Sequence, residues 1–169
     1  MAKLLFLIVP NGFRDEEYDV PKKVFEKNGI EVVACSDKPG PLTGKLGKVT
    51  ANVDILLKDV NIEDYDAIAI AGGQDYFWND PKILEMLKKM DAVKKPIGAI
   101  CISGCIPSQA GIMKGRKSTV FETPASVAEL EKHGAIYTGE DLTVDGNVVT
   151  ANGPAPAQKF AEEILKLLK

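Results

Sequence analysis

Histidine, arginine and cysteine are scarce in this sequence, and their scarcity excludes several kinds of site. The 169 residues include one histidine and three cysteines, and the only arginines are Arg14 and Arg116. A protein-bound zinc ion needs several Cys, His or acidic ligands at characteristic spacings, which one histidine and scattered cysteines do not provide. We therefore expect no metal centre, and we expect the cysteines to be free thiols rather than a disulfide framework.

The sequence also lacks an excess of positive charge and an apolar run of membrane length. Its net charge is -3, which predicts neither a nucleic acid nor an anionic membrane as a partner. The apolar run Lys3–Val9 is stopped by Pro10-Asn11-Gly12, so it is too short for a bilayer and does not have the pattern of a signal peptide. These absences predict a cytoplasmic location.

Apolar runs of strand length alternate with segments of helical periodicity along most of the chain. Runs without a polar face are typical of parallel strands that are covered on both sides. The alternation therefore predicts an α/β protein with a mostly parallel sheet and helices on both faces. The expected strands are Lys3–Val9, Ile30–Cys35, Asp66–Ala71 and Pro96–Ile100, and the expected helices are Val20–Asn28, Pro81–Met90, Ile102–Met113, Ala125–Lys132 and Ala155–Leu168.

Two segments depart from this alternation. Pro41–Asp54 is rich in Gly, Lys and Thr and predicts a β-ribbon, and Leu142–Thr150 predicts a hairpin with its turn at Asp145-Gly146. The chain has no internal repeat, linker or low-complexity tract, and its length suits one hydrophobic core. We therefore expect residues 1–169 to form one domain.

The segment Ala99-Ile100-Cys101-Ile102-Ser103 places a cysteine directly after an apolar strand. A nucleophile elbow requires small side chains two residues before and after the nucleophile, because the strand turns sharply into a helix there. Such a turn holds the thiol beside a helix N-terminus, which favours the thiolate. The pattern predicts an activated Cys101, although a free cysteine at a strand end is also often a small buried core residue.

A glycine pair, Gly72-Gly73, follows another expected strand and reaches the same edge of the parallel sheet. Loop glycines can turn their N–H groups toward a bound oxygen. The N–H of Gly73, together with that of Ile102 after the cysteine, could form an oxyanion hole. The alternative is that the two glycines only end a strand tightly.

Together these motifs resemble the ThiJ/PfpI superfamily, which includes a parkinsonism-associated protein deglycase and archaeal intracellular protease-like proteins. The resemblance covers nearly the whole chain. It implies a flavodoxin-like three-layer sandwich of the class I glutamine amidotransferase-like type, in a homo-oligomer that is most simply a dimer. It rests on the glycine pair after the third strand, Ala-Ile-Cys at the elbow, acidic residues before a helix proline, Gly-Arg-Lys at 115–117 and Thr-Ala-Asn-Gly-Pro at 150–154.

The resemblance also implies the residues of a site. The family's elbow cysteine corresponds to Cys101, its oxyanion glycine to Gly73, and its glutamate four residues before the helix proline to Glu17. Since a carboxylate repels a thiolate, Cys101 can ionise only if Glu17 holds a proton, so we expect the pair to share one. Glu16 would be the inward acid if the helix began one residue differently. The pocket residues that the family implies are Gly72, Phe121, Asn152, Gly153 and Pro154.

The sequence departs from the family at its histidines. Members with a protease-like dyad carry histidine directly after the cysteine, where this chain has Ile102, and others carry one at the position of Phe121. The one histidine, His133, precedes Gly134 at the end of an expected helix, so we expect it at the surface. Peptide hydrolysis is the less plausible activity, because no histidine is placed to protonate a leaving amine.

The remaining groups and the resemblance predict a cofactor-free, cysteine-dependent enzyme that acts on small reactive carbonyls, as a glyoxalase or deglycase. Cys101 would add to an aldehyde, and Glu17 would move a proton between adjacent carbons. The alternative is a redox sensor or stress-response protein in which Cys101 is oxidised to sulfenic or sulfinic acid. Cys35 and Cys105 are expected to be core thiols. Asn152 stands where relatives can carry arginine, and its amide removes a charge that an anionic substrate would use.

Overall fold

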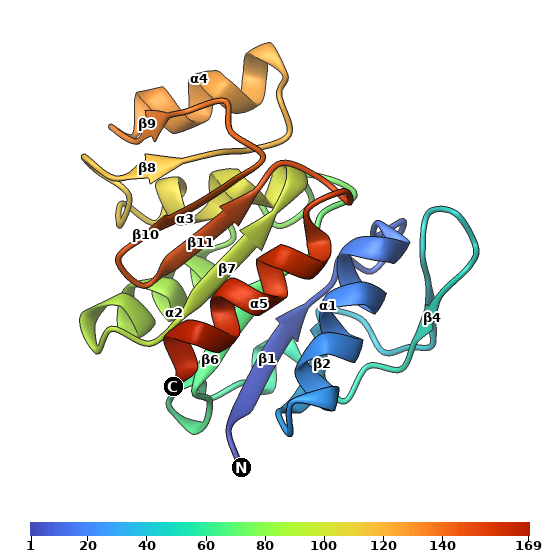
Figure 1. Cartoon of the computed structure of the whole chain (residues 1–169). Helices are drawn as coiled ribbons and strands as arrows, with labels where there is room; N and C mark the ends of the chain where they lie inside the picture. Colours follow the sequence, from blue (N-terminus) through green and yellow to red (C-terminus); the bar gives the residue numbers. More distant parts are fainter.

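The computed structural model of the chain describes all 169 residues, and its centre is a sheet of seven strands (Figure 1). The strands are β1 (Lys3–Leu7), β2 (Glu31–Ser36), β5 (Ile55–Leu56), β6 (Ala67–Ile70), β7 (Ile97–Ile100), β10 (Leu142–Asp145) and β11 (Val148–Ala151). They lie in the order β10-β11-β7-β6-β1-β2-β5. All neighbours are parallel except β10 and β11, which form the predicted hairpin.

The order of the central strands indicates where a ligand would bind. When β1, β2, β6, β7 and β11 are numbered along the chain, their order in the sheet is 2-1-3-4-5. This is the flavodoxin-like order, in which ligands bind at the carboxyl ends of the strands, where the strand order reverses. The reversal lies between β1 and β6. The loops that follow these two strands therefore border the expected site, beside the segment that follows β7.

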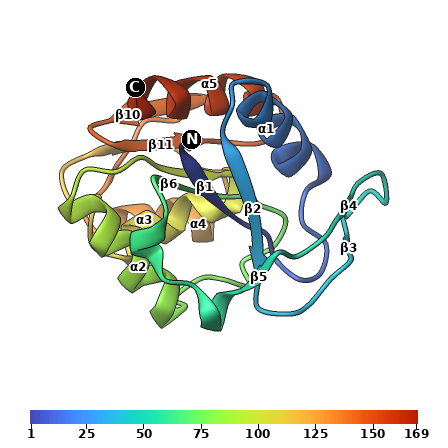
Figure 2. The same ribbon diagram turned by 90° about the horizontal axis from the view of Figure 1, so that it is seen from below.

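Helices cover both faces of the sheet (Figure 2). α1 (Asp15–Lys27) and α5 (Ala157–Leu168) lie on one face, and α2 (Pro81–Ala92) and α3 (Ile106–Gln109) lie on the other. Gly98 on β7 allows α5 to pack closely, because a Cβ there would lie 2.8 Å from the Phe160 ring. The predicted three-layer α/β sandwich with a mostly parallel sheet is confirmed.

The first helix begins at Asp15, not at Val20 as the periodicity predicted. Acidic side chains fill its first turn, where the helix dipole stabilises negative charge. Pro21 lies inside the helix, although proline removes a helical hydrogen bond and usually marks a helix start or end. The apolar periodicity starts only after the acidic turn, and it therefore concealed the true beginning of the helix.

The segment after the elbow is a second correction. One helix was predicted over Ile102–Met113, but the structure has a 3₁₀ turn over Cys101–Cys105 followed by the single α-helical turn of α3. Gly104 and Pro107 both lie in this segment, and both residue types have low helix propensity. The cysteine is consequently not followed by a long helix.

The predicted β-ribbon is formed by β3 (Leu42–Thr43) and β4 (Thr50–Ala51), and it extends away from the sheet (Figures 1 and 2). The buried carboxylate of Asp15, at the start of α1, holds its tip. It accepts backbone hydrogen bonds of 2.7, 2.9 and 2.9 Å from the N–H groups of Leu46, Lys48 and Val49.

The remaining elements lie beside the hairpin. The predicted helix near residue 125 is present as α4 (Pro124–Lys132). β8 (Lys117–Ser118) and β9 (Ile136–Tyr137) form a parallel pair that was not predicted, since two residues are too few to show a periodicity.

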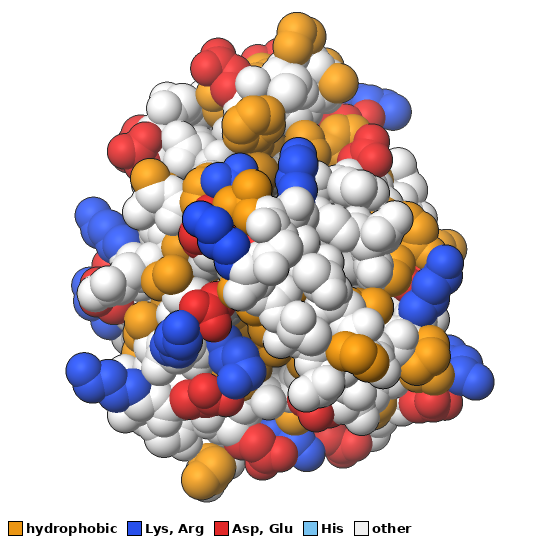
Figure 3. All heavy atoms as spheres, turned by 90° about the vertical axis from the view of Figure 1, so that its right-hand side faces the viewer, with side chains coloured by type: hydrophobic (Ala, Val, Ile, Leu, Met, Phe, Trp, Pro, Cys, Tyr) orange, Lys and Arg blue, Asp and Glu red, His pale blue; other side chains and the backbone are white.

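The surface carries charges of both signs. Figure 3 shows one face, on which Lys and Arg side chains are interspersed with Asp and Glu side chains. On α1, Lys22 pairs with Glu26 and Lys23 pairs with Asp19, each at 2.6 Å. None of the helices has the length and apolar character needed to cross a membrane.

Candidate active site

Cys101 lies at the end of β7 in an uncommon backbone conformation. Its φ angle is +62°, a left-handed value that residues other than glycine adopt rarely. Two side chains hold this turn: the Ser103 hydroxyl donates to Ala71 O at 2.7 Å, and the Trp78 indole N–H donates to Ile102 O at 3.0 Å. The sharp turn expected of an elbow is therefore present, and Trp78 supports it through this hydrogen bond.

Glu17 reaches the same place from the first turn of α1. Its side chain is fully buried, and the Gly72 N–H donates to its Oε1 at 3.1 Å. Its other oxygen, Oε2, is buried without a hydrogen-bond partner. Glu16 is partly exposed and pairs with Arg14 at 2.8 Å, so Glu17 is the inward acid. An unpaired buried carboxyl oxygen is rare, and a proton on the carboxyl would make it a donor.

Two glycines bring the carboxyl and the cysteine together. A Cβ at Gly72 would lie 2.5 Å from Glu17 Oε1 and 2.6 Å from Cys101 Cβ, so both groups border the space that the missing side chain leaves. Gly73 has a φ of +125°, a conformation that is open mainly to glycine. A larger residue at Gly72 would therefore push Glu17 and Cys101 apart.

Burial controls the charge of Glu17. It raises the pKa of this carboxyl from 4.5 to about 7, against the opposing effects of the Cys101 thiol, the Gly72 N–H and the positive charge of Arg14. A carboxyl with such a pKa is partly protonated at neutral pH. In its neutral form it can donate a hydrogen bond to a thiolate rather than repel it.

The surroundings of Cys101 oppose its ionisation while Glu17 is charged, and activation of this cysteine stays a prediction. Burial and then the negative charge of Glu17 raise the pKa of Cys101 to about 12, whereas the N–H groups of Ile102 and Gly73 lower it. Because each group resists ionisation when the other is charged, the two titrate as a pair.

Arg14 is a residue of this region that the sequence analysis did not identify. Its backbone N–H donates to Gly72 O at 3.0 Å, which places it beside the glycine that lies between Glu17 and Cys101. The hydrogen bond to Glu16 raises the pKa of Arg14, and the charges of Glu17 and Cys101 also raise it. In the sequence, an arginine before an acidic cluster indicates only a surface ion pair.

Phe121 lies next to the elbow, as the resemblance implied. Its backbone N–H donates to Cys101 O at 3.2 Å, and its side chain is 49% exposed. The backbone of Phe121 is therefore at the elbow, and its role as a pocket residue stays a prediction.

Asn152, Gly153 and Pro154 follow β11, which pairs in register with β7, so they reach the same edge of the sheet as Cys101. Gly153 is buried, and the other two are half-buried. The Asn152 amide donates to the Asp141 carboxylate at 3.1 Å. This amide is therefore engaged with the segment before β10 and forms no hydrogen bond with the cysteine.

The other titratable candidates lie outside this cluster. His133 follows α4 and its Nε2 is 3.5 Å from a Glu129 carboxylate oxygen. Cys35 and Cys105 are buried, and burial raises the pKa of each to about 12, so both are core thiols as predicted. No three His, Cys, Asp or Glu side chains are grouped so that they could hold a metal ion.

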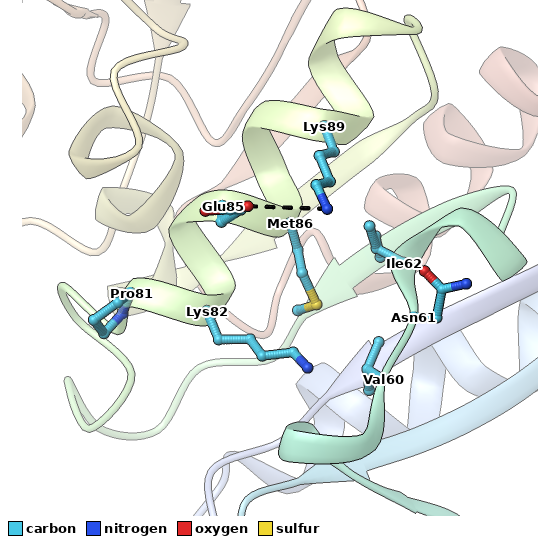
Figure 4. A pocket seen from close by; sticks show the side chains of 8 residues that line it. All are labelled: Val60, Asn61, Ile62, Pro81, Lys82, Glu85, Met86 and Lys89. Atoms are coloured by element: carbon cyan, nitrogen blue, oxygen red, sulfur yellow. Dashed lines mark ion pairs between the residues drawn. The ribbon is translucent and has the colours of Figure 1, made fainter.

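A separate hollow of about 420 Å³ lies between α2 and the two 3₁₀ turns at 57–59 and 62–64 (Figure 4). Lys89 pairs there with Glu85 at 3.9 Å, and Lys82 donates to Lys58 O at 3.1 Å. None of the residues that line it belongs to the Cys101 cluster. They are Val60, Asn61, Ile62, Pro81, Lys82, Glu85, Met86 and Lys89.

Comparison with known proteins relates these features to one family. The model of the DJ-1/PfpI family matches residues 2–167. An uncharacterized protein of Methanocaldococcus jannaschii is 44% identical over 172 residues, which cover 99% of this chain and 83% of that protein. The deglycase PfpI of Pyrococcus furiosus is 32% identical, with 99% of each chain covered. The crystal structure of a ThiJ/PfpI domain protein from Brachyspira murdochii has a TM-score of 0.90 at 30% identity, and the match covers 98% of this chain and 95% of that one.

Proposed function

Since this chain belongs to the DJ-1/PfpI family, we propose that it is a cysteine-dependent enzyme that acts on small reactive carbonyls, as a deglycase or glyoxalase. The observation that carries the proposal is the pair formed by Cys101 and the buried Glu17, which border one space beside Gly72. The deglycase name of the Pyrococcus furiosus relative supports the same class of activity.

Cys101 is the nucleophile in this proposal. With the shared proton on Glu17, the thiolate adds to the aldehyde carbon of a 2-oxoaldehyde, a sulfur–carbon bond forms, and the former carbonyl oxygen takes up a proton to give a hemithioacetal. The N–H groups of Gly73 and Ile102 already act on the sulfur. In this proposal they also stabilise the negative charge that develops on an oxygen next to the sulfur.

Glu17 is the acid and base. As a carboxylate it removes the proton from the carbon bound to sulfur, and as an acid it returns a proton to the neighbouring carbon, which yields a thioester of a 2-hydroxy acid. Water then hydrolyses the thioester and frees the thiol. One carbon is oxidised while its neighbour is reduced, so no external oxidant is needed. A pKa of about 7 suits a group that both takes and gives a proton at neutral pH.

Peptide hydrolysis is the weaker alternative. The residue after the cysteine is Ile102 and not a histidine, and the one histidine, His133, lies at the end of α4. Cys101 therefore has no histidine beside it that could protonate a leaving amine. The homodimer that the resemblance implied is part of the same proposal.

Methylglyoxal consumption with detection of lactate tests the proposed activity. We expect turnover by the unmodified protein, a loss of about 10³-fold or more in Cys101→Ser and of about 10²-fold or more in Glu17→Gln. Glu26→Gln is the matched control, because Glu26 lies on the same helix but pairs with Lys22 at the surface, and it should retain full activity.

Turnover that persists in Cys101→Ser would contradict the proposal. No turnover in any variant would also contradict it and would favour the redox alternative. In that case mild peroxide should oxidise Cys101 selectively, which peptide mass spectrometry would detect.

A further inference from the structure

The position of Arg14 adds a positively charged group to the site. Its backbone N–H bonds to Gly72 O at 3.0 Å, and Gly72 is the residue whose open side borders both Glu17 and Cys101. The backbone of Arg14 therefore lies beside the residue that borders the space in which the reaction is proposed. The guanidinium belongs to the loop that follows β1, at the point where the strand order reverses.

The guanidinium is held on one side and open on the other. Its Nε donates to Glu16 Oε2 at 2.8 Å, and neither Nη nitrogen forms a hydrogen bond. The side chain is 35% exposed and that of Glu16 is 34% exposed, so the ion pair is accessible from solvent. Arginine presents its free N–H groups as a planar fork that matches a carboxylate or a phosphate.

The electrostatic effects of Arg14 on its neighbours agree with the position of its backbone beside Gly72. Negative charge on Glu17 and on Cys101 raises the pKa of Arg14, and the positive charge of Arg14 lowers the pKa of Glu17. The guanidinium is therefore near enough to interact with both reactive groups. Asn152, where an arginine was considered from the sequence, directs its amide to Asp141 instead.

We infer that Arg14 is a specificity-determining residue, whose free Nη groups bind an oxyanion of the substrate, a carboxylate or a phosphate, while the substrate's carbonyl lies at Cys101. The inference rests on the proposed function for its substrate class, within which a 2-oxoaldehyde that carries an anionic group would bind better than a neutral one such as methylglyoxal. Arg14 would then supply the positive charge for an anionic substrate that the Asn152 amide lacks.

Alkylation of Cys101 by a charged and a neutral reagent tests the inference without requiring turnover. In both iodoacetate and iodoacetamide the thiolate attacks the CH₂ carbon, the sulfur–carbon bond forms, the carbon–iodine bond breaks and iodide leaves. The two reagents differ in the carboxylate alone. The ratio of their rates at Cys101, followed by mass spectrometry, therefore reports the charge beside the thiol and is independent of how much thiolate is present.

Arg14→Gln should lower the iodoacetate-to-iodoacetamide rate ratio by about 3- to 10-fold, the range of one partly exposed charge-assisted contact. Arg14→Lys should keep most of the ratio, because it keeps the charge. Lys23→Gln is the matched control, since it removes one positive charge from α1 at a side chain that is 72% exposed and pairs with Asp19. It should leave the ratio unchanged. Higher salt should reduce the difference between the unmodified protein and Arg14→Gln.

An equal ratio in Arg14→Gln and Lys23→Gln would overturn the inference, and so would a parallel fall in both rates, which would indicate a structural role alone. Failure of the proposed function is a different result, because it is measured with methylglyoxal. If turnover is absent but the ratio falls, Arg14 still binds oxyanions beside Cys101. If turnover is present and the ratio does not change, only the inference about Arg14 fails.

Discussion

Gly72 is the residue whose missing side chain allows Cys101 and Glu17 to meet. Gly72→Ala would place a Cβ 2.5 Å from the Glu17 carboxyl and 3.0 Å from the backbone oxygen of Ile100. We expect the variant to lower the free energy of unfolding by about 1–3 kcal/mol, the usual cost of overpacking. Because the carboxyl must move away from the thiol, methylglyoxal turnover should fall as in Glu17→Gln. Urea unfolding and the lactate assay measure the two effects.

Gly153→Ala is the control for this substitution. Nothing lies within 4 Å of the Cβ that it would add, so its free energy of unfolding should stay within about 0.5 kcal/mol of that of the unmodified protein. If Gly72→Ala is as stable as Gly153→Ala, the close packing of Glu17 and Cys101 around Gly72 is wrong.

Single residues of the site differ in how well the sequence indicated them. Cys101 has a local signature, with small residues at fixed offsets, and Glu17 is placed by the resemblance and by its distance from Pro21. Arg14 has no such signature, because its role depends on a backbone bond to Gly72, which is distant in sequence. The raised pKa of Cys101 could not be predicted from the sequence either, because burial of the sulfur is its largest cause.

At the scale of elements, Asp15 connects α1 to the β-ribbon. Its carboxylate is 1% exposed and accepts three backbone hydrogen bonds from the ribbon tip. Burial opposes ionisation, but these bonds hold the pKa of Asp15 below its ordinary value. A lowered carboxyl pKa stabilises the fold above the unfolded pKa, and this contribution is lost as the pH falls through the folded pKa.

Asp15→Asn should therefore loosen the ribbon. Its amide keeps one acceptor oxygen and brings two donors toward three N–H groups, so we expect a loss of about 2–3 kcal/mol in the free energy of unfolding. The amides of Leu46, Lys48 and Val49 should exchange hydrogen faster than in the unmodified protein. Hydrogen-exchange mass spectrometry of residues 42–51 together with urea unfolding measures both effects.

Asp19→Asn provides the comparison on the same helix, because Asp19 makes one surface ion pair with Lys23. Such pairs contribute about 0–1 kcal/mol, so this variant should not change exchange in the ribbon. Equal exchange in the two variants would show that Asp15 does not hold the ribbon tip.

The elements themselves were predicted where their apolar pattern was long. Strands β1, β2, β6 and β7 and the hairpin follow from buried runs and turn residues. The start of α1 was missed because the acidic first turn carries no apolar periodicity. The helix predicted after Cys101 was wrong because Gly104 and Pro107 in that segment have low helix propensity. Local pattern indicates the kind of element better than its ends.

At the scale of the whole molecule, the strand order brings the site together. The loop after β1 leads into α1, whose first turn supplies Glu17. The loop after β6 supplies the glycine pair, and the segment after β7 begins with Cys101. The alternation of strands and helices was enough to predict a parallel sheet and a shared edge, since right-handed crossovers leave few other topologies. One domain over residues 1–169 stays a prediction.

The central claim is that Cys101 and Glu17 share one proton, and the pH dependence of Cys101 alkylation by iodoacetamide tests it most directly. As pH rises through about 7, the pair loses one proton, and the remaining proton is divided between carboxyl and thiol. The alkylation rate should therefore rise near pH 7, level off, and rise again only at much higher pH.

Glu17→Gln should remove the step near pH 7, because an amide cannot take up the proton of the thiol, and only a single rise at higher pH should remain. Glu16→Gln should retain the step, since Glu16 lies at the surface beside Arg14. If the profiles of the unmodified protein and Glu17→Gln coincide, the two groups do not share a proton, and the account of the site is wrong.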